Sequence, residues 1–393
     1  MQTEPLRPKQ SEGVTAVRPI SDAEHAGRIE SLRAAARSAG FDVIIAYGAH
    51  RDYQPADLRY LARWYCVEEE TACVVVPVEG PTTLLTDASW DLERAQAEAY
   101  ADAMRYEANL GPALAELVRE DAGSKARIGI TGFRFFPAPA YLALREALPD
   151  AVIEDATETT SRLRMVKSPA ELALMRAASE ISDGAMAAGL AQIAVGRTEI
   201  DVAAAAEGVI RAAGAEPSFV TEMGSGPRTA LGTFLPGQRA LSHGEFAVLD
   251  CGARLHGYHG DMCRTVVVGG PDAEQRGILE AVEFAVSQAI NAILPGATVG
   301  QIRDVAATAI AERGYGDHWW DAFMPHGNGT GQHEAPNAKE HPDQELIEGM
   351  VLCIEPGVTL SGRGAVIIEQ MIAVGAEGAE VFNRLPTNMW DHL

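Results

Sequence analysis

The chain has 393 residues, so it is long enough for two domains, each with its own core. Hydrophobic residues make up 47% of it and charged residues 22%, and this composition excludes an intrinsically disordered protein. Acidic residues outnumber basic ones by 55 to 32, and the net charge of −23 would repel both a nucleic-acid backbone and an anionic membrane surface. We therefore expect a partner that is neither nucleic acid nor membrane.

Two further features of the chain bear on its location. No apolar run approaches the roughly 18 residues of a membrane helix, and the opening residues MQTEPLRPKQSEG lack the apolar segment of an export signal. The cysteines are odd in number and form no CxxC pair, which favours buried thiols over disulfides or a zinc knuckle. They are Cys66, Cys73, Cys251, Cys263 and Cys353. We expect a soluble protein of the cytoplasm.

The first part of the chain alternates between strand-like and helical segments. Residues 1–20 are polar and contain proline, which predicts a flexible tail. A helix is predicted from an N-cap at Ser21 to a stop at Gly40. Strands are expected at 42–47, 71–80, 82–87, 127–132 and 151–156, and helices near 89–100, 110–121 and 137–147. This order predicts an α/β domain over residues 21–158.

A long helix opens the second part of the chain. Ser168, Pro169 and Glu171 form the pattern of a capping box with proline at the first helical position. Beyond it, short strands are expected near 246–251, 264–268, 351–355 and 366–373, and helices at about 199–213, 273–293 and 299–313. Short strands flanked by long helices predict an α+β domain with a curved antiparallel sheet, which we assign to residues 159–393.

Four acidic residues and one histidine of this second part are candidate metal ligands. They are Asp250, Asp261, His326, Glu355 and Glu369. Taken singly, most have a structural alternative, since Asp250 can begin a turn, Asp261 can lie at a hairpin tip and Glu355 can end a strand. Glu369 differs because it interrupts the apolar runs VII and MIAV, where burial without a cation is expensive. Together these donors suit two divalent ions about 3.5–4 Å apart.

A glycine-rich segment, PHGNGTGQHEAP, contains both His326 and His333. Small residues around His326 allow the backbone to approach a metal centre closely. His333 would then return toward the same pocket as a hydrogen-bond donor. The alternative for His333 is an ordinary histidine at a helix start or on the surface.

These motifs resemble those of the pita-bread metallohydrolases, the group that includes Xaa-Pro dipeptidases, aminopeptidase P, methionine aminopeptidase and creatinase. The resemblance rests on D-x-G-A…G-Y…D-x-x-R-T-V at Asp250–Val266, H-G-x-G…H-E-x-P at His326–Pro336, E-P-G at Glu355–Gly357, and Glu369. It covers about 160–375 and, more loosely, the N-terminal part. It implies a pita-bread catalytic domain preceded by a smaller α/β domain of the creatinase N-terminal type.

The resemblance also implies roles for the residues. The five candidate ligands would bind two Mn²⁺, Co²⁺, Fe²⁺ or Zn²⁺ ions, with Asp261 and Glu369 bridging them. A water acidified by the metals would be the nucleophile, Glu355 would move its proton, and His333 would donate to the substrate carbonyl or its oxyanion. The implied activity is hydrolysis of the Xaa-Pro amide bond of a dipeptide or short peptide, by an enzyme that forms a homodimer.

Several residues expected in the substrate pocket depart from the peptidase pattern. The peptidases commonly have histidine, an apolar side chain and arginine where this chain has Thr233, Gln332 and Ile367. Loop drift, a surface amide and ordinary strand packing are the simpler explanations. Trp319 and Trp320, just upstream of His326, either form an aromatic wall for a methylated cation or pack in the core.

These departures leave two alternatives to a peptidase. One keeps the fold and the metals but acts on a non-peptide small molecule, as an amide or amidine hydrolase or as a dimethylsulfoniopropionate-type lyase. The lyases carry an aspartate two residues beyond the first ligand, where this chain has Gly252, which argues against a close copy. The other alternative is a binding protein without catalysis or metal, against which the five candidate ligands argue.

Overall fold

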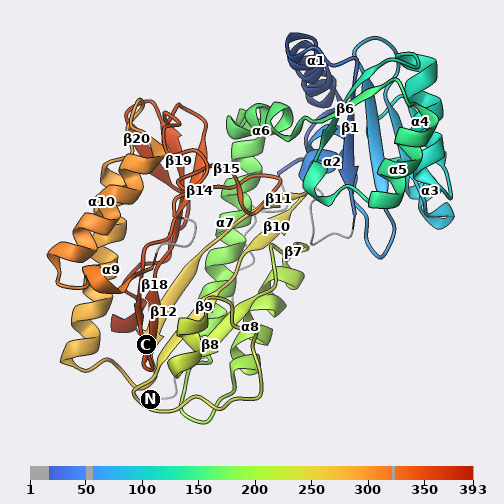
Figure 1. Cartoon of the computed structure of the whole chain (residues 1–393). Coiled ribbons are helices and arrows are strands. Elements are labelled where there is room, and N and C mark those ends of the chain that lie inside the picture. The colour runs from blue at the N-terminus through green and yellow to red at the C-terminus, as the bar shows by residue number, and fades with distance from the viewer. Residues whose placement is uncertain (1–16, 50–55, 321–323, 393) are drawn as a thin grey trace.

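The computed structural model describes residues 17–49, 56–320 and 324–392, so residues 1–16 of the predicted tail lie outside it. The described residues form two units, connected through α6 (Thr157–Met165) and the start of α7 (Pro169–Leu190). Figure 1 shows the first unit, in blue and cyan, beside one end of the second. None of the described helices combines the length and the apolar character that crossing a lipid bilayer requires.

The first unit is built on a six-stranded sheet in the order β4-β3-β2-β1-β5-β6. Its strands are β1 (Val43–Gly48), β2 (Ala72–Pro77), β3 (Thr83–Thr86), β4 (Ala103–Tyr106), β5 (Arg127–Thr131) and β6 (Val152–Asp155). Its helices are α1 (Asp22–Ala39), α2 (Ala56–Ala62), α3 (Leu92–Glu98), α4 (Leu110–Asp121) and α5 (Ala138–Ala147). These elements confirm the predicted alternation of strands and helices.

Helices cover both faces of this sheet, and that explains why its central strands are apolar throughout. Successive side chains of a strand point to opposite faces. In β1, Ile45 therefore packs with α4 and α5, whereas Ile44 packs with α1 and α2. The sheet is mixed, because β1 pairs antiparallel with β2 and parallel with β5.

The second unit contains several small antiparallel sheets between long helices, as the α+β prediction requires. Its strands are β7 (Glu216–Pro217), β8 (Glu222–Ser225), β9 (Phe246–Asp250), β10 (Ala253–Leu255), β11 (Tyr258–His259), β12 (Cys263–Val267), β13 (Trp319–Trp320), β14 (His326–Gly327), β15 (Glu334–Asn337), β16 (Val351–Ile354), β17 (Gly357–Leu360), β18 (Gly364–Ile367), β19 (Gln370–Gly375) and β20 (Gly378–Val381). Its other helices are α8 (Glu199–Ala212), α9 (Ala273–Asn291) and α10 (Val299–Glu312). The described chain also has short 3₁₀ helices, η2 (Ser89–Asp91), η3 (Phe133–Phe135), η4 (Gly226–Leu231), η5 (Gly316–His318) and η6 (Met389–Asp391).

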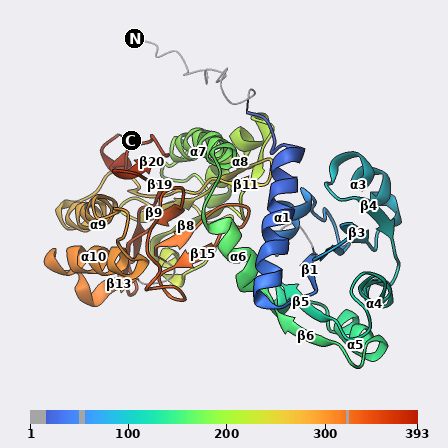
Figure 2. The same ribbon diagram turned by 90° about the horizontal axis from the view of Figure 1, so that it is seen from above.

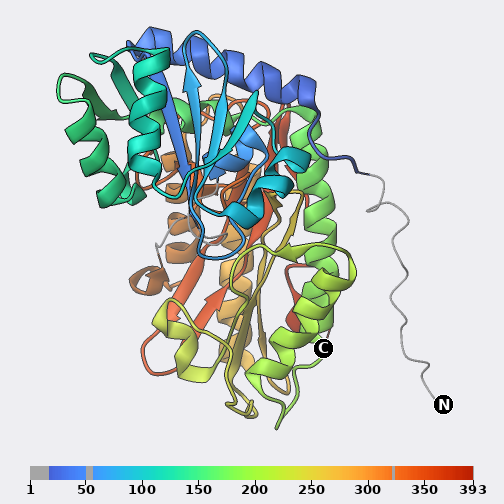
Figure 3. The same cartoon turned by 90° about the vertical axis from the view of Figure 1, so that its right-hand side faces the viewer.

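The strands of the second unit lie between two helix pairs. In Figure 1, α9 and α10 (orange) flank the strands on one side and α7 and α8 (green) on the other. Figure 2 shows α1 and α6 at the junction of the two units, and Figure 3 shows the first unit above the end of the second. One large apolar core joins the strands to all four long helices of this unit.

The predicted capping box at the start of α7 is confirmed, and it also joins the two units. The Ser168 hydroxyl accepts from the Glu171 backbone N–H, and the Glu171 carboxylate accepts from the Ser168 backbone N–H. The same Glu171 carboxylate lies 3.2 Å from the Arg28 guanidinium of α1 and accepts from the Tyr258 hydroxyl at 2.9 Å. Because Arg28, Glu171 and Tyr258 are buried, the contact fixes the first unit against the second.

Two of the predicted strands are interrupted, each at a candidate ligand. The segment predicted over 351–355 ends at Ile354, and that predicted over 366–373 is split between β18 and β19 at Glu369. The reason is that the chain changes sheets at these points: β16 pairs with β19, whereas β17 pairs with β18. Glu355 and Glu369 therefore lie together at the point where the β16–β19 pair ends and the β17–β18 pair begins.

Gly252 lies two residues after the candidate ligand Asp250 and is required by close packing of the backbone. A Cβ atom there would lie 2.0 Å from the carbonyl oxygen of Gly260 and 2.9 Å from the Cβ of Ser218. We expect Gly252→Ala to lower the stability by about 2–4 kcal/mol in a thermal unfolding measurement. Gly208→Ala is the matched control, since a Cβ there meets no atom within 4 Å and alanine favours the helix. Equal melting temperatures for the two variants would contradict this assignment.

Candidate metal centre and active site

The five predicted ligands come from separate segments and line one cavity of about 620 Å³. Antiparallel pairing of β9 with β12 sets Cys263 opposite Asp250, so that Asp261, just before β12, returns beside Asp250. His326 lies on β14, opposite Cys353 of β16. Glu355 lies just after β16, and Glu369 lies between β18 and β19. Four acidic side chains and an imidazole are thereby brought together.

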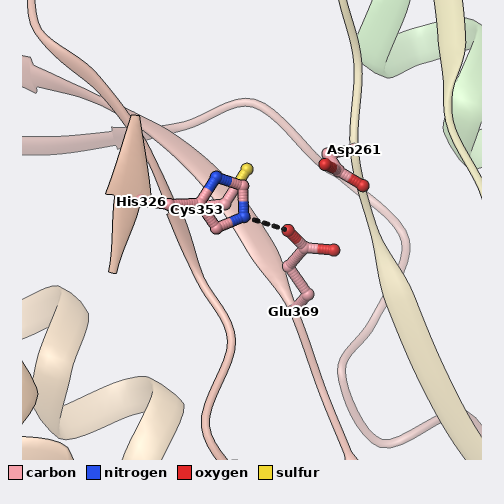
Figure 4. Close-up of side chains that lie close together, drawn as sticks. All are labelled: Asp261, His326, Cys353 and Glu369. Carbon is pink, nitrogen blue, oxygen red and sulfur yellow. Dashed lines mark ion pairs between the residues drawn. The ribbon is translucent and has the colours of Figure 1, made fainter. Parts of the chain in front are cut away.

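The donor atoms form two groups that share one residue. Oxygen atoms of Asp250, Glu355 and Glu369 lie within 4.8 Å of one another. Donor atoms of Asp261, His326, Cys353 and Glu369 form a second group with the same spacing. Figure 4 shows this second group, with 3.8 Å between His326 Nε2 and Glu369 Oε1. Glu369 belongs to both groups, which suits a bridging carboxylate, whereas Asp261 belongs to one.

The electrostatics of the acidic residues fit a cation. Burial raises the pKa of Asp261 to about 7 and, together with the charges of Asp261 and Glu222, that of Glu355 to about 8. Burial and the neighbouring carboxylates also raise the pKa values of Asp250 and Glu369 well above their ordinary range. The ion pairs described for the basic residues of this cavity, Arg164 and Arg254, are with Asp57, Glu334 and Glu216 and not with the four acidic candidate ligands.

Unsatisfied oxygen atoms point to the same conclusion. Asp250 Oδ1 and Asp261 Oδ1 are buried without a hydrogen-bond partner. A buried carboxylate oxygen without a partner is unfavourable, and a divalent cation is the partner that an oxygen-rich cluster of this charge prefers. The residues present therefore fit a metal centre.

His326 is held in the form that binds a metal. Its Nδ1 lies 3.0 Å from the Gly327 carbonyl oxygen, to which it can only donate, so the proton lies on Nδ1 and the lone pair on Nε2. Burial and the neighbouring His333 lower its pKa to about 3, which keeps the ring neutral. The lone pair of Nε2 faces Glu369.

Cys353 is a site residue that the sequence reasoning missed. The prediction that all five cysteines are buried and free is confirmed, but Cys353 Sγ also belongs to the second donor group. Asn328 Nδ2 lies 3.6 Å from this sulfur. A signal was present, because Cys353 is two residues before Glu355 and side chains two apart in an extended segment share a face.

His333 lies at the edge of the cluster. Its ring is 4.4 Å from that of His326, edge to face, and burial lowers its pKa. The next residue, Glu334, is buried and pairs with Arg164 at 2.5 Å and Lys167 at 3.0 Å. These two cations, which sequence reasoning did not single out, hold the loop that carries His333.

Three of the five predicted pocket residues line the cavity. They are Thr233, Trp320 and Gln332, and Gln332 Nε2 is 3.5 Å from Asp261 Oδ2. Arg164, Arg254 and His259 also contribute to its wall, although the sequence did not reveal this.

The other two predicted pocket residues lie elsewhere. Trp319 packs against the main core, because adjacent side chains of β13 point in opposite directions and only Trp320 faces the cavity. Ile367 is 4% exposed and packs against Phe234 and Val248 between the sheets. The ordinary packing explanation therefore holds for Ile367.

The sequence and the fold both match known proteins. Residues 173–376 match the model of metallopeptidase family M24, and residues 28–166 match the creatinase/prolidase N-terminal domain. The Xaa-Pro dipeptidase of Pyrococcus furiosus is 36% identical over 232 residues, which are 59% of this chain and 64% of that relative. The match thus spans less than two thirds of the curated relative's length.

Solved structures with the same fold cover nearly the whole chain. The Xaa-Pro dipeptidase of Bacillus anthracis superposes with a TM-score of 0.81 at 29% identity, covering 93% of this chain and 99% of that one. Dipeptidase PepE of Mycobacterium ulcerans gives 0.82 at 27% identity, covering 94% and 98%. The sequence match, the shared fold and the converging ligands agree, and the chain belongs to metallopeptidase family M24.

Proposed function

We propose that this protein is a metal-dependent hydrolase that cleaves the Xaa-Pro amide bond of a dipeptide or short peptide. The observation that carries the proposal is the convergence of four carboxylates and His326 on one cavity. Relatives that are named Xaa-Pro dipeptidases support the choice of substrate. They favour it over a non-peptide amide, an amidine or a sulfonium compound.

The donor groups indicate where two divalent ions would be held. Asp250, Glu355 and Glu369 would hold one ion, and Asp261, His326 and Glu369 the other, with Mn²⁺, Co²⁺, Fe²⁺ and Zn²⁺ as candidates. When bound, such a pair supplies an acidified water and polarises the carbonyl of the scissile bond.

The chain's own residues supply the proton transfers and the orientation of the substrate. Glu355 belongs to the donor group with Asp250 and Glu369, so its carboxylate would lie beside a water held by the ions. We assign it to take the proton from the attacking water and to deliver it to the leaving proline nitrogen. Desolvation lowers the pKa of His333, which favours its neutral form, and its ring N–H would donate to the oxygen of the scissile carbonyl.

Apolar side chains form part of the cavity wall and suit a pyrrolidine ring. Phe219, Val220, Leu235 and Trp320 line the same cavity as the candidate ligands. We further propose that the enzyme is a cytoplasmic homodimer, on the basis of its resemblance to the pita-bread peptidases. Light scattering coupled to size exclusion tests the dimer.

Metal removal and substrate choice test the proposed function together. Turnover of Gly-Pro and Ala-Pro is expected to disappear after dialysis against EDTA and to return with Mn²⁺ or Co²⁺, because the ions would acidify the attacking water and polarise the scissile carbonyl. Gly-Ala, creatine and dimethylsulfoniopropionate, assayed in parallel, are expected to show little or no turnover. Full activity after chelation, or turnover of a non-peptide compound alone, would refute the proposal.

A further inference from the structure

A second cavity, of about 530 Å³, lies between the two units, behind the catalytic cavity. Four arginines and two histidines line it, together with Glu98 and Glu216. The basic residues that line it are His25, Arg28, Arg59, Arg63, Arg254 and His256. It shares Arg254 and Thr330 with the catalytic cavity, so the two lie back to back.

Three of the four arginines in this wall already have counter-ions. Arg28 pairs with Glu24 at 2.9 Å and with Glu171 at 3.2 Å. Arg63 pairs with Asp22 at 3.0 Å. Arg254 pairs with Glu216 at 2.5 Å. The acidic residues of the wall, Glu98 and Glu216, form their described ion pairs with Arg94 and Arg254 and not with the remaining arginine, although the charge of Glu216 also acts on it.

Arg59 is the exception. It is only 7% exposed, and its Nε and Nη2 are buried without any hydrogen-bond partner. The guanidinium lies 4.0 Å from the centre of the Tyr65 ring, and no ion pair joins it to a described acidic residue. Burial, with the charge of Arg254, lowers the pKa of Arg59 to about 9. A buried guanidinium without a counter-ion is unfavourable, and a bound anion would relieve this.

We propose that the cavity binds a small oxyanion, with Arg59 as its anchor and Arg254 as a second donor. A guanidinium is planar and pairs with phosphate or carboxylate oxygens through parallel N–H donors. The shared chemistry is thus that of an oxyanion, either phosphate-like or a carboxylate. The anion would lie against the wall of the catalytic cavity but independent of its metals, so this proposal goes beyond the proposed peptidase activity and does not depend on it.

Binding to the full-length protein tests the proposal. Inorganic phosphate and acetate are titrated separately by calorimetry in chloride buffer, with the protein as purified and after chelation of its metals. At least one of the two anions is expected to bind with the same affinity in both preparations. The anion that binds more tightly shows whether the site prefers a phosphate-like group or a carboxylate. Binding that disappears on chelation would place the anion on the metals instead, and the absence of binding by both anions would end the proposal.

Variants of opposite effect localise the anion. Arg59→Met is expected to weaken binding at least about tenfold, because it removes the unpaired donors. Glu216→Gln is expected to strengthen binding several-fold, because it removes the counter-charge of Arg254. Arg63→Met is the matched control and is expected to change binding less than about threefold, since that arginine is partly exposed and paired with Asp22.

The same variants keep the test independent of folding. Without anion, Arg59→Met is expected to melt no lower than the wild type, because an unpaired buried charge has been removed. Phosphate or acetate should then raise the melting temperature of the wild type but not of this variant. If Arg59→Met binds like the wild type, or if Arg59→Met and Arg63→Met weaken binding equally, the site is not this cavity. Should Arg59→Met fail to fold, unchanged affinity in Glu216→Gln would overturn the proposal.

Discussion

Replacing Glu355 with glutamine is expected to lower kcat for Gly-Pro hydrolysis at least about a thousandfold. Glutamine preserves the shape of the side chain but cannot take a proton, and its amide is a weaker ligand than a carboxylate. Both losses act on a residue that lies in one donor group with Asp250 and Glu369. Steady-state kinetics at saturating Mn²⁺, together with the metal content of the purified variant, give the measurement.

Glu222→Gln is the matched control for this loss. Glu222 lines the same cavity and burial raises its pKa, but it belongs to neither donor group. Its replacement is expected to reduce kcat by less than about tenfold. If Glu355→Gln retains two bound ions and more than a tenth of the wild-type kcat, the carboxyl does not move the proton.

The second large effect concerns stability without metal. The carboxyls of Asp261 and Glu355 have ordinary pKa values of 3.8 and 4.5, which burial raises to about 7 and about 8. Between the ordinary and the raised pKa of each group, the folded chain binds more protons than the unfolded chain. The free energy of unfolding must therefore fall as the pH rises through this range. Each unit of raised pKa corresponds to about 1.4 kcal/mol. As far as these two groups are concerned, the chelated protein is thus expected to be fully stabilised below about pH 4 and to lose that stability progressively between about pH 4 and pH 8.

Thermal unfolding of the chelated protein at pH 5.5 and pH 8.0 measures this effect. The melting temperature is expected to be lower at pH 8.0 by on the order of 5–10 °C. Addition of Mn²⁺ at pH 8.0 should raise it again, because the cations neutralise the carboxylates and bind only the folded state. Glu369→Gln, which removes one of the buried acids, should show a smaller pH effect after chelation. A chelated wild type that is equally stable at both pH values would contradict the proposed electrostatics.

Local patterns in the sequence were sufficient for the main elements. The capping box at Ser168 depends only on neighbouring residues, and α7 begins where it predicts. Glu369 could be recognised as a ligand because a carboxylate in an apolar run needs a partner wherever the run lies in the fold. The other four candidates indicated a metal site only when taken together and through their match to the family motifs, and the structure gathers them on one cavity.

Other features of the site were decided by the tertiary structure. The interruption of the predicted strands at Glu355 and Glu369 reflects a change of sheet, which depends on partners distant in the chain. Cys353 faces the ligands because β14 pairs with β16 at that register. β13 pairs with β17 so that Trp319 lies opposite Val358 and Trp320 opposite Gly357. This register turns Trp320 toward the cavity and Trp319 away from it.

The sequence by itself determined which chemical groups are present and which segments form helices and strands, because capping and periodicity act over a few residues. Only the tertiary structure decided which of these groups meet. The pairing of Glu334 with Arg164 and Lys167 and the isolation of Arg59 between two units both depend on distances across the fold. Such distances follow from sheet register and from the docking of one unit on the other, and no short stretch of the chain encodes either.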